Sequence, residues 1–373
     1  MSTIDRTSRR AARHRGRLAA ALFVSVLVVA ACGDDSTTES AATPAEATTG
    51  AGAPSQLEGT VRLGYFPNVT HAPALVGVAE GTFAAALGDG VDLRTFTFNA
   101  GTEAVEALLA ESLDLTFIGP NPAINAFAKS AGEAIRIISG STSGGAYLVV
   151  KPEITSADQL AGTTLATPSL GNTQDVALRA WLKQNFLETT PEGGGDVSIL
   201  PQSNSTTLDS FISGAIDGAW VPEPWATRLV EEGGGRVLVD ERDLWPDTKG
   251  EYVTTHVIVR TAFLNDHPEL VKAVLAGLAD AIDVITDAPT AAQADVVAQI
   301  GEITGSAPDA GVIAKSFANL TFTLDPIAAS LQKSADDAIA VGLLDPVDLD
   351  GIYDLTLLNE VLADRGTAPV SGL

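Results

Sequence analysis

Cysteine and basic residues are scarce in this chain of 373 residues. The single cysteine, Cys32, excludes a disulfide within one chain and a cysteine-based metal site. Four histidines leave little material for a histidine-rich zinc site, and no metal or other cofactor is expected. Lysine and arginine total 22 against 47 acidic residues. Since phosphate binding needs a basic face, nucleic acid is excluded as a partner.

Signatures of common catalytic sites are also missing. There is no Gly-x-x-x-x-Gly-Lys phosphate loop and no His-Glu-x-x-His motif. The nearest approach to a nucleophile elbow, Gly140-Ser141-Thr142-Ser143-Gly144, has threonine where serine is required. No nucleophile, base and orienting residue stand out together, so the sequence favours binding over catalysis.

Residues 1–31 have the layout of a secretory signal peptide. Six arginines precede the apolar run Leu18–Ala31, which is too short to span a membrane comfortably. Arg9-Arg10 is a weak indication of twin-arginine export. The sequence Val29–Gly33 resembles a bacterial lipobox, so we expect a lipid on Cys32 that anchors the protein outside the cytoplasm. The alternative is a plain secretory signal that leaves Cys32 as a free thiol.

A flexible tether is expected over residues 32–56, because small and polar residues dominate there without periodicity. From about Leu57, strands alternate with helices, which predicts parallel α/β sheets.

Two similar stretches, Leu113–Ala123 and Ala215–Trp225, organise the folded part. Each follows an amphipathic helix, Glu103–Ala110 or Thr206–Ser213, and predicts a buried strand that stops at Pro-x-Pro before another helix. Ligands of α/β sheets bind beyond the carboxyl ends of the strands, where both turns lie. The repetition therefore predicts two lobes that face each other across a cleft. One copy alone is explained equally well as a strand-stopping turn.

The order of the elements predicts that the chain crosses between the lobes twice. Lobe 1 is expected to comprise residues 57–145 and 255–373, and lobe 2 residues 146–254. Hinge motion is expected at crossings near Ala146 and Thr254. The C-terminal part is expected to be mainly helical.

Several segments at predicted strand ends and helix starts carry candidate ligand-binding residues. After the first strand, residues that can wall or hydrogen-bond a ligand are Tyr65, Phe66, Asn68, Thr70 and His71. Backbone N–H groups at predicted helix starts come from Gly101, Thr102, Asn172 and Thr173, and the glycine-rich segment 140–145 adds Ser143 and Gly144. Each segment has an ordinary reading as a turn, a helix cap or a crossover loop, with Asn172 as the cap of its helix.

Glu223 and Trp225 lie in the second Pro-x-Pro turn. A carboxylate repels an anion, so three roles stay open for Glu223. It can favour the following helix start, tie the lobes together or meet an ammonium group of a zwitterionic ligand. Trp225 can stack on a ligand or pack in the core.

Four motifs together resemble the extracytoplasmic solute-binding proteins of ABC importers, within the nitrate/sulfonate/taurine group and closest to its aliphatic-sulfonate branch. The resemblance covers roughly residues 57–278, and the motifs are Gly64–Pro73, Gly101–Glu103, Ile118–Ala123 and Glu223–Trp225. It implies a type II periplasmic-binding-protein fold of the Venus-flytrap kind, closure of the lobes on the ligand, and delivery to a permease driven by a separate ATPase. A monomer that is not an enzyme is expected.

The resemblance implies an oxyanion in the cleft, with Asn121 and His256 added to the candidate residues above. Nitrate or bicarbonate is an alternative ligand, and so is a neutral heterocycle such as a thiamine-precursor pyrimidine stacked on Tyr65 or Trp225. A secreted enzyme that uses His71 and Glu223 as acid and base is the alternative from another class.

Overall fold

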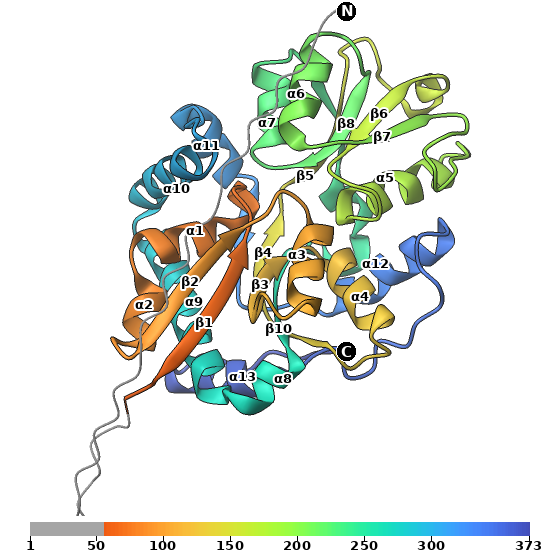
Figure 1. Cartoon of the computed structure of the whole chain (residues 1–373). Coiled ribbons are helices and arrows are strands. Elements are labelled where there is room, and N and C mark those ends of the chain that lie inside the picture. The colour runs from red at the N-terminus through yellow and green to blue at the C-terminus, as the bar shows by residue number, and fades with distance from the viewer. Residues whose placement is uncertain (1–55) are drawn as a thin grey trace, which may run out of the picture. The chain divides into compact units, whose positions relative to one another are not determined.

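The computed structural model describes residues 56–373. The predicted signal peptide, the lipid on Cys32 and nearly all of the tether lie outside the described residues. The described part forms two sheets flanked by helices (Figure 1), so the predicted two-lobed α/β fold is confirmed. The expectation of parallel sheets was wrong, because each sheet also contains strands that run antiparallel to their neighbours. We call the larger sheet with its helices lobe 1 and the smaller sheet with its helices lobe 2.

The sheet of lobe 1 has the strand order β11-β4-β10-β3-β1-β2. Strands β1 and β3 are parallel, whereas β10 runs antiparallel to both β3 and β4. Its strands are β1 (Gly59–Tyr65), β2 (Val91–Thr97), β3 (Leu115–Ile118), β4 (Ile135–Gly144), β10 (Val253–Arg260) and β11 (Leu320–Phe322). The helices of this part are α1 (Ala72–Ala79), α2 (Thr82–Leu87), α3 (Gly101–Leu109), α4 (Pro120–Lys129), α8 (Thr261–Asp266), α9 (Pro268–Asp287), α10 (Pro289–Thr304), α11 (Ala310–Phe317), α12 (Ala329–Ala340) and α13 (Thr356–Asp364).

The sheet of lobe 2 has the order β7-β6-β8-β5-β9. Its strands are β5 (Ala146–Val150), β6 (Thr164–Thr167), β7 (Ser198–Pro201), β8 (Gly218–Pro222) and β9 (Arg236–Asp240). Its helices are α5 (Thr173–Gln184), α6 (Asn204–Ile212) and α7 (Trp225–Glu231).

Both sheets bury apolar side chains on two faces, because side chains alternate along a strand. On β10, Val257 and Val259 join one core cluster, while Ile258 between them joins another. On β5, Leu148 and Val149 likewise belong to different clusters. Each sheet is therefore covered by helices on both sides, and its strand ends remain to form a site.

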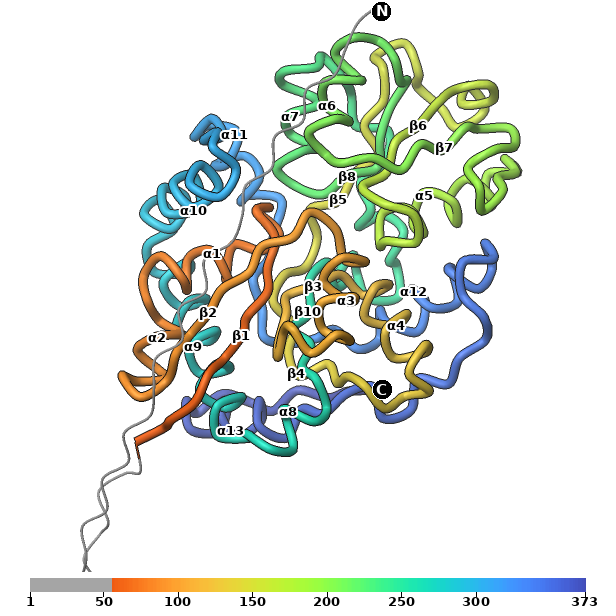
Figure 2. Tube along the Cα trace, viewed as in Figure 1, coloured from red at the N-terminus to blue at the C-terminus, as the bar shows by residue number. Residues whose placement is uncertain are grey.

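The chain passes from lobe 1 to lobe 2 between β4 and β5 and returns through short helical turns, Glu241–Leu244 and Pro246–Thr248, into β10 (Figure 2). Gly144 and Gly145 at the first passage have φ of 80° and 75°. An added Cβ on Gly145 would lie 2.2 Å from a side-chain carbon of Leu320, so the passage needs glycine for conformation and for space.

The expectation of a glycine-rich loop over residues 140–145 was wrong. Strand β4 continues to Gly144 and pairs there with β10 and β11. Gly140 N donates to Leu324 O at 2.9 Å, and a Cβ on Gly140 would lie 2.1 Å from the carbonyl oxygen of Asp325. The glycine thus allows the C-terminal segment to approach the strand closely.

The C-terminal part is helical as expected, but it also supplies β11 to the sheet of lobe 1. The alanine-rich run 273–300 forms two helices rather than one. Helix α9 ends at Asp287 and α10 begins at Pro289, because proline cannot continue a helix but suits its first turn. Within residues 56–373, no helix is both long and apolar enough to cross a membrane.

The repeated strand unit includes an aspartate at the same place in both lobes. Asp114 N donates to Arg62 O at 3.0 Å, and Arg62 N donates back to Asp114 Oδ2 at 2.9 Å. Asp217 and Thr164 exchange the same two bonds at 2.8 and 2.9 Å. Each aspartate directly precedes a strand, and its two bonds tie that strand to the parallel strand beside it.

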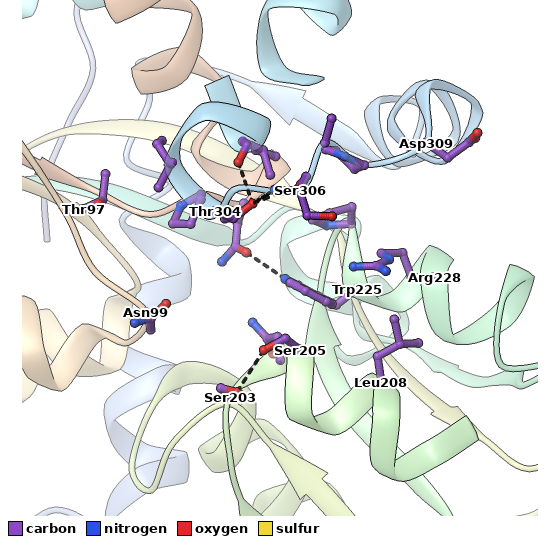
Figure 3. Close-up of a pocket in the computed structure, with 18 of the residues that line it drawn as sticks. Thr97, Asn99, Ser203, Ser205, Leu208, Trp225, Arg228, Thr304, Ser306 and Asp309 are labelled. Atoms are coloured by element: carbon purple, nitrogen blue, oxygen red, sulfur yellow. Dashed lines mark hydrogen bonds between the residues drawn. The ribbon is translucent and has the colours of Figure 1, made fainter. Parts of the chain in front are cut away.

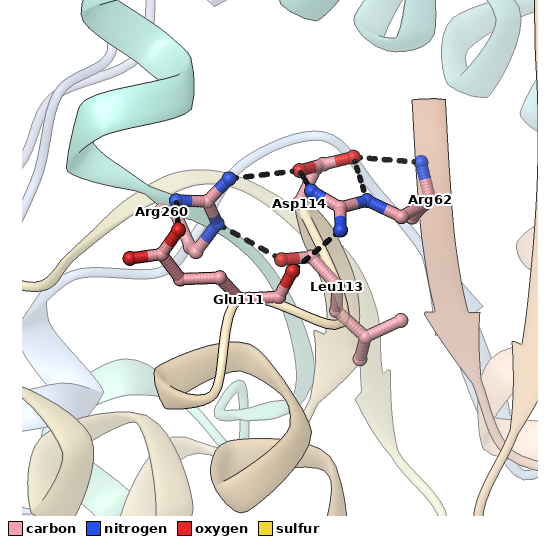
Figure 4. A network of polar contacts seen from close by, with 5 residues as sticks. All are labelled: Arg62, Glu111, Leu113, Asp114 and Arg260. Carbon is pink, nitrogen blue, oxygen red and sulfur yellow. Dashed lines mark hydrogen bonds and ion pairs between the residues drawn. The ribbon is translucent and has the colours of Figure 1, made fainter. Parts of the chain in front are cut away.

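Cations complete each of these aspartate sites, and Figure 4 shows the one around Asp114. Asp114 pairs with Arg62 at 2.6 Å and with Arg260 at 3.0 Å, and Asp217 pairs with Lys151 at 2.7 Å. Burial alone would raise the pKa of Asp114, but hydrogen bonds from Arg62 and Arg260 outweigh burial and lower it. The network joins β1, β3 and β10 at the ends of these strands that lie away from lobe 2.

Candidate functional site

An inner cavity of about 40 Å³ lies between the lobes, where strand ends and helix starts of both lobes meet. It is lined by Phe66, Asn68, Thr70, His71, Asn99, Ala100, Gly101, Gly119, Pro122, Asn172, Thr173, Gln174, Pro222 and Thr254. Since about 10–15 Å³ admits one water molecule, the cavity has room for only a few heavy atoms.

Three helix N-termini border the inner cavity. Helices α3 and α4 come from lobe 1 and start after Ala100 and Gly119. Helix α5 comes from lobe 2 and starts after Asn172, whose Oδ1 accepts from Asp175 N at 2.9 Å, so the predicted cap is confirmed. A helix N-terminus carries partial positive charge, and α3 and α5 also offer spare N–H donors, whereas Pro120 and Pro122 in the first turn of α4 have no N–H. The cavity therefore attracts an anion through dipoles contributed by both lobes.

None of the residues that line the inner cavity is aspartate, glutamate, lysine or arginine. His71 is the only histidine among them, and burial lowers its pKa to about 3. Its imidazole is therefore neutral at pH 7 and stacks on Phe66 with ring centroids 4.5 Å apart. Recognition here must use hydrogen bonds and dipoles rather than a full counter-charge.

Two polar atoms at the inner cavity are buried without a hydrogen-bond partner among the described residues. They are His71 Nδ1 and Thr173 Oγ1. Buried polar atoms are nearly always paired in folded proteins, and each unpaired atom costs about 1–3 kcal/mol. A ligand with several acceptor oxygens would pair with both when the neutral imidazole of His71 carries its proton on Nδ1.

Gly119 permits the two lobes to approach at the inner cavity. A Cβ at this position would lie 2.5 Å from Thr173 Oγ1, which belongs to the other lobe. The φ of Gly119 is −70°, so the requirement for glycine is purely one of space.

An outer cavity of about 820 Å³ adjoins the inner one (Figure 3). Asn68 and Asn99 line both cavities. Trp225 Nε1 of lobe 2 donates to Asn68 Oδ1 of lobe 1 at 2.9 Å, as the dashed line in Figure 3 marks. This bond crosses between the lobes beside the boundary of the two cavities.

Glu223 joins the lobes outside both cavities. Its side chain is 1% exposed, and its two oxygens accept four hydrogen bonds. Two of these bonds come from the backbone N–H and the hydroxyl of Thr227 in lobe 2. The other two come from lobe 1, from Ser316 Oγ in α11 and from Asn319 Nδ2 just after that helix. Of the three roles left open by the sequence, the geometry matches support of the helix start and the tie between lobes.

The structure brings about half of the candidate residues to a cavity. Phe66, Asn68, Thr70, His71, Gly101, Asn172 and Thr173 line the inner cavity and Trp225 lines the outer one. Neither cavity is lined by Tyr65, Thr102, Asn121, Ser143, Gly144, Glu223 or His256.

Specific contacts explain three of the candidates that lie elsewhere. Tyr65 packs in the core of lobe 1, Asn121 Nδ2 donates to Ser334 O at 2.9 Å, and a ring nitrogen of His256 lies 3.1 Å from Pro326 O. Lining residues that the sequence reasoning did not single out as ligand-binding include Asn99, Ala100, Gln174 and Thr254. Their only sequence signal is their position beside a predicted strand end or helix start.

A metal centre has no obvious ligands in this region. Across residues 56–373, no three or more histidine, cysteine, aspartate or glutamate side chains are grouped so that they could hold a metal ion.

The profile of the NMT1-like family matches residues 56–301. The chain is 29% identical over 211 residues to the taurine-binding periplasmic protein of Escherichia coli (strain K12), a match that covers 56% of this chain and 62% of that protein. The chain thus spans less than two thirds of the length of this relative.

Solved structures share the fold at lower identity. The periplasmic aliphatic sulphonate-binding protein SsuA from Escherichia coli is 21% identical with a TM-score of 0.63, over 79% of this chain and 92% of SsuA. The periplasmic nitrate-binding protein NrtA from Synechocystis PCC 6803 is 15% identical with a TM-score of 0.69, over 82% of this chain and 88% of NrtA. The resemblance stated from the sequence motifs is therefore confirmed, and the chain belongs to the NMT1-like family with a two-lobed periplasmic-binding-protein fold.

Proposed function

We propose that this protein is the extracytoplasmic solute-binding component of an ABC importer and that it captures a small sulfonate or a related oxyanion between its lobes. One observation carries the proposal: three helix N-termini from both lobes border one small cavity that has no acidic side chain in its wall. Such an arrangement binds an anion only when the lobes are together.

The same reasoning favours particular contacts for the head of the ligand. The unpartnered His71 Nδ1 and Thr173 Oγ1 supply hydrogen bonds, and the starts of α3 and α5 supply backbone N–H groups. Sulfonate, with three acceptor oxygens and a fixed charge, suits this donor set. Nitrate and bicarbonate remain competing ligands that the experiment below separates.

The wider organisation proposed from the sequence completes the function. After removal of residues 1–31, a lipid on Cys32 would anchor the tether, and with it the protein, to the outer face of the cell membrane. The protein would act as a monomer whose two lobes, residues 57–145 with 255–373 and residues 146–254, close on the ligand by hinge motion near Ala146 and Thr254. The closed protein would then present the ligand to a permease driven by a separate ATPase.

An enzyme on this fold is disfavoured by the position of its expected base. Glu223 lines neither cavity, and both of its oxygens are committed to hydrogen bonds. It is therefore not available to act with His71 on a bound compound.

Asn172→Asp tests the anion site. The aspartate can still cap α5, but it adds a negative charge at the inner cavity, so calorimetry should give at least about tenfold weaker binding of sulfonates. Asn185→Asp, which makes the same change at the other end of α5, is the matched control and should leave affinity unchanged. Equal affinities for wild type and Asn172→Asp would remove α5 from the site. Titrations with nitrate, bicarbonate and pyrimidines identify the competing ligands.

A further inference from the structure

An ion pair between Asp175 and Arg179 is almost completely buried within α5 of lobe 2. Arg179 Nε donates to Asp175 Oδ2 at 2.9 Å, and the side chains of Arg179 and Asp175 are 1% and 0% exposed. In each of the other ion pairs of residues 56–373, at least one side chain is 14% exposed or more. Because replacing a buried ion pair by apolar residues is often neutral for stability, stability alone does not account for this pair.

The carboxylate of Asp175 holds the turn that connects β6 to α5. Its Oδ1 accepts from Thr167 Oγ1 at 2.8 Å at the end of β6, and its Oδ2 accepts from Gly171 N at 2.9 Å. Asn172 Oδ1 accepts in return from Asp175 N, so the two side chains close the turn reciprocally. Asn172 and Thr173 in this turn line the inner cavity. Asp175 therefore fixes the position of the helix start that borders the cavity.

The negative charge of Asp175 disfavours an anion at the same place. Asp175 is the third residue of α5, and its neighbour Gln174 lines the inner cavity. Charges that are shielded from water interact strongly over short distances. Arg179 cancels this charge from one helical turn further along, and its Nη1 also donates to Thr190 O, which holds the guanidinium in place.

We propose that Asp175 and Arg179 are positioning residues of the anion site. Asp175 holds the turn that presents the start of α5, and Arg179 cancels the charge that Asp175 would otherwise place beside the ligand. Neither residue lines the inner or the outer cavity. The inference rests on the proposed function, since it assumes that the inner cavity binds an anion.

Calorimetric titration with methanesulfonate, hexanesulfonate and nitrate separates the two roles, using each anion that wild type binds. Arg179→Met leaves the carboxylate without its counter-charge and should weaken binding at least about tenfold. Asp175→Asn/Arg179→Met removes both charges but keeps an acceptor for the turn, so affinity should return to within about threefold of wild type. Asp175→Ala/Arg179→Met also removes the acceptor and should again bind at least about tenfold more weakly than wild type.

The ion pair of Lys151 with Asp217 supplies a matched control in the same lobe. Asp217 bonds to the start of β6, whereas Asp175 bonds to the end of that strand. Lys151→Met and Asp217→Asn/Lys151→Met should keep the affinity of wild type to within about twofold. If Arg179→Met does not fold, Asp175→Asn replaces it in the test of charge. Asp175→Asn leaves only the positive charge and should bind at least about threefold more tightly than Asp175→Asn/Arg179→Met.

Contrary results refute the inference in distinct ways. Wild-type affinity in Arg179→Met, or equal affinity of Asp175→Asn and its double variant, would mean that the charge of Asp175 does not reach the ligand. Equal weakening in Arg179→Met and Asp175→Asn/Arg179→Met would mean that lost packing, not charge, is responsible. Equal affinity of the two double variants would mean that Asp175 does not hold the turn. If wild type binds none of the three anions, the proposed function fails and the inference fails with it.

Discussion

Glu241 makes the stability of this protein depend on pH in a way that one substitution can isolate. The residue begins the short helical turn between β9 and β10, and its side chain is 2% exposed. Trp220 Nε1 donates to Glu241 Oε2 at 2.7 Å. Burial raises the pKa of Glu241 to about 7, although the Trp220 hydrogen bond and the charge of Lys333 act in the opposite direction.

The sign and size of the effect follow from this shift. Folding favours the protonated carboxyl group, so Glu241 does not lower the free energy of unfolding below about pH 4.5, where the carboxyl group is protonated in both states. The cost grows as pH rises and becomes constant above the folded-state pKa of about 7. At about 1.4 kcal/mol for each pKa unit, the full cost is about 3 kcal/mol. The negative charge of nearby Asp337 raises the pKa of Glu241 further.

Glu241→Gln keeps the carbonyl acceptor for Trp220 but cannot ionise. Its free energy of unfolding, minus that of wild type, should increase by about 2–3 kcal/mol between about pH 5 and pH 8. Urea unfolding followed by tryptophan fluorescence at both pH values measures this difference. Glu153→Gln, at an exposed position, is the matched control and should show no such change. A difference that does not vary with pH would refute the assignment of a neutral, buried carboxyl group.

Three further predictions concern the aspartate pairs and the inner cavity. Asp114→Ala should lower the free energy of unfolding by about 3 kcal/mol, because it removes the buried carboxylate that pairs with both Arg62 and Arg260. Asp217→Ala, at a side chain 29% exposed, should cost about 1 kcal/mol in the same urea assay. Because the pKa of His71 is about 3, sulfonate affinity measured by calorimetry should vary less than about twofold between about pH 5.5 and 8, and a steep rise in acid would contradict a neutral imidazole. Gly119→Ala should weaken ligand binding at least about tenfold, since its Cβ meets Thr173 Oγ1, and unchanged affinity would mean that the lobes need not approach this closely.

Local patterns were sufficient to predict most of the fold. Strand alternation and the repeated Pro-x-Pro turn predicted the two α/β lobes, because each feature depends on residues close together in the chain. The three-residue strand β11 was not predicted, since Leu320–Phe322 is too short to carry a periodic signal. The glycines of β4 predicted a loop because the sequence does not reveal which distant segment packs against them.

The candidate site likewise contains residues that local sequence patterns could predict and residues that they could not. Asn68, His71 and Thr173 were recognisable because they follow strands or start helices. The pairing of Asn68 with Trp225 and the enclosure of Glu223 depend on how the two lobes meet, which no local pattern encodes. His256 was expected at the ligand as a side-chain donor, yet its position on the central strand β10 turns it toward Pro326 and Tyr353.

The order in which the strands occur along the chain bears on how the protein folds. Every strand of the smaller sheet lies within residues 146–240, so that sheet can assemble from one continuous segment. The larger sheet draws strands from three separate segments, and its last strand, β11, comes about sixty residues after β10. Ser316 and Asn319, the partners of Glu223, lie in the same late segment. Lobe 2 can therefore fold before the C-terminal region is available, whereas lobe 1 and the contact that joins the lobes must wait for that region.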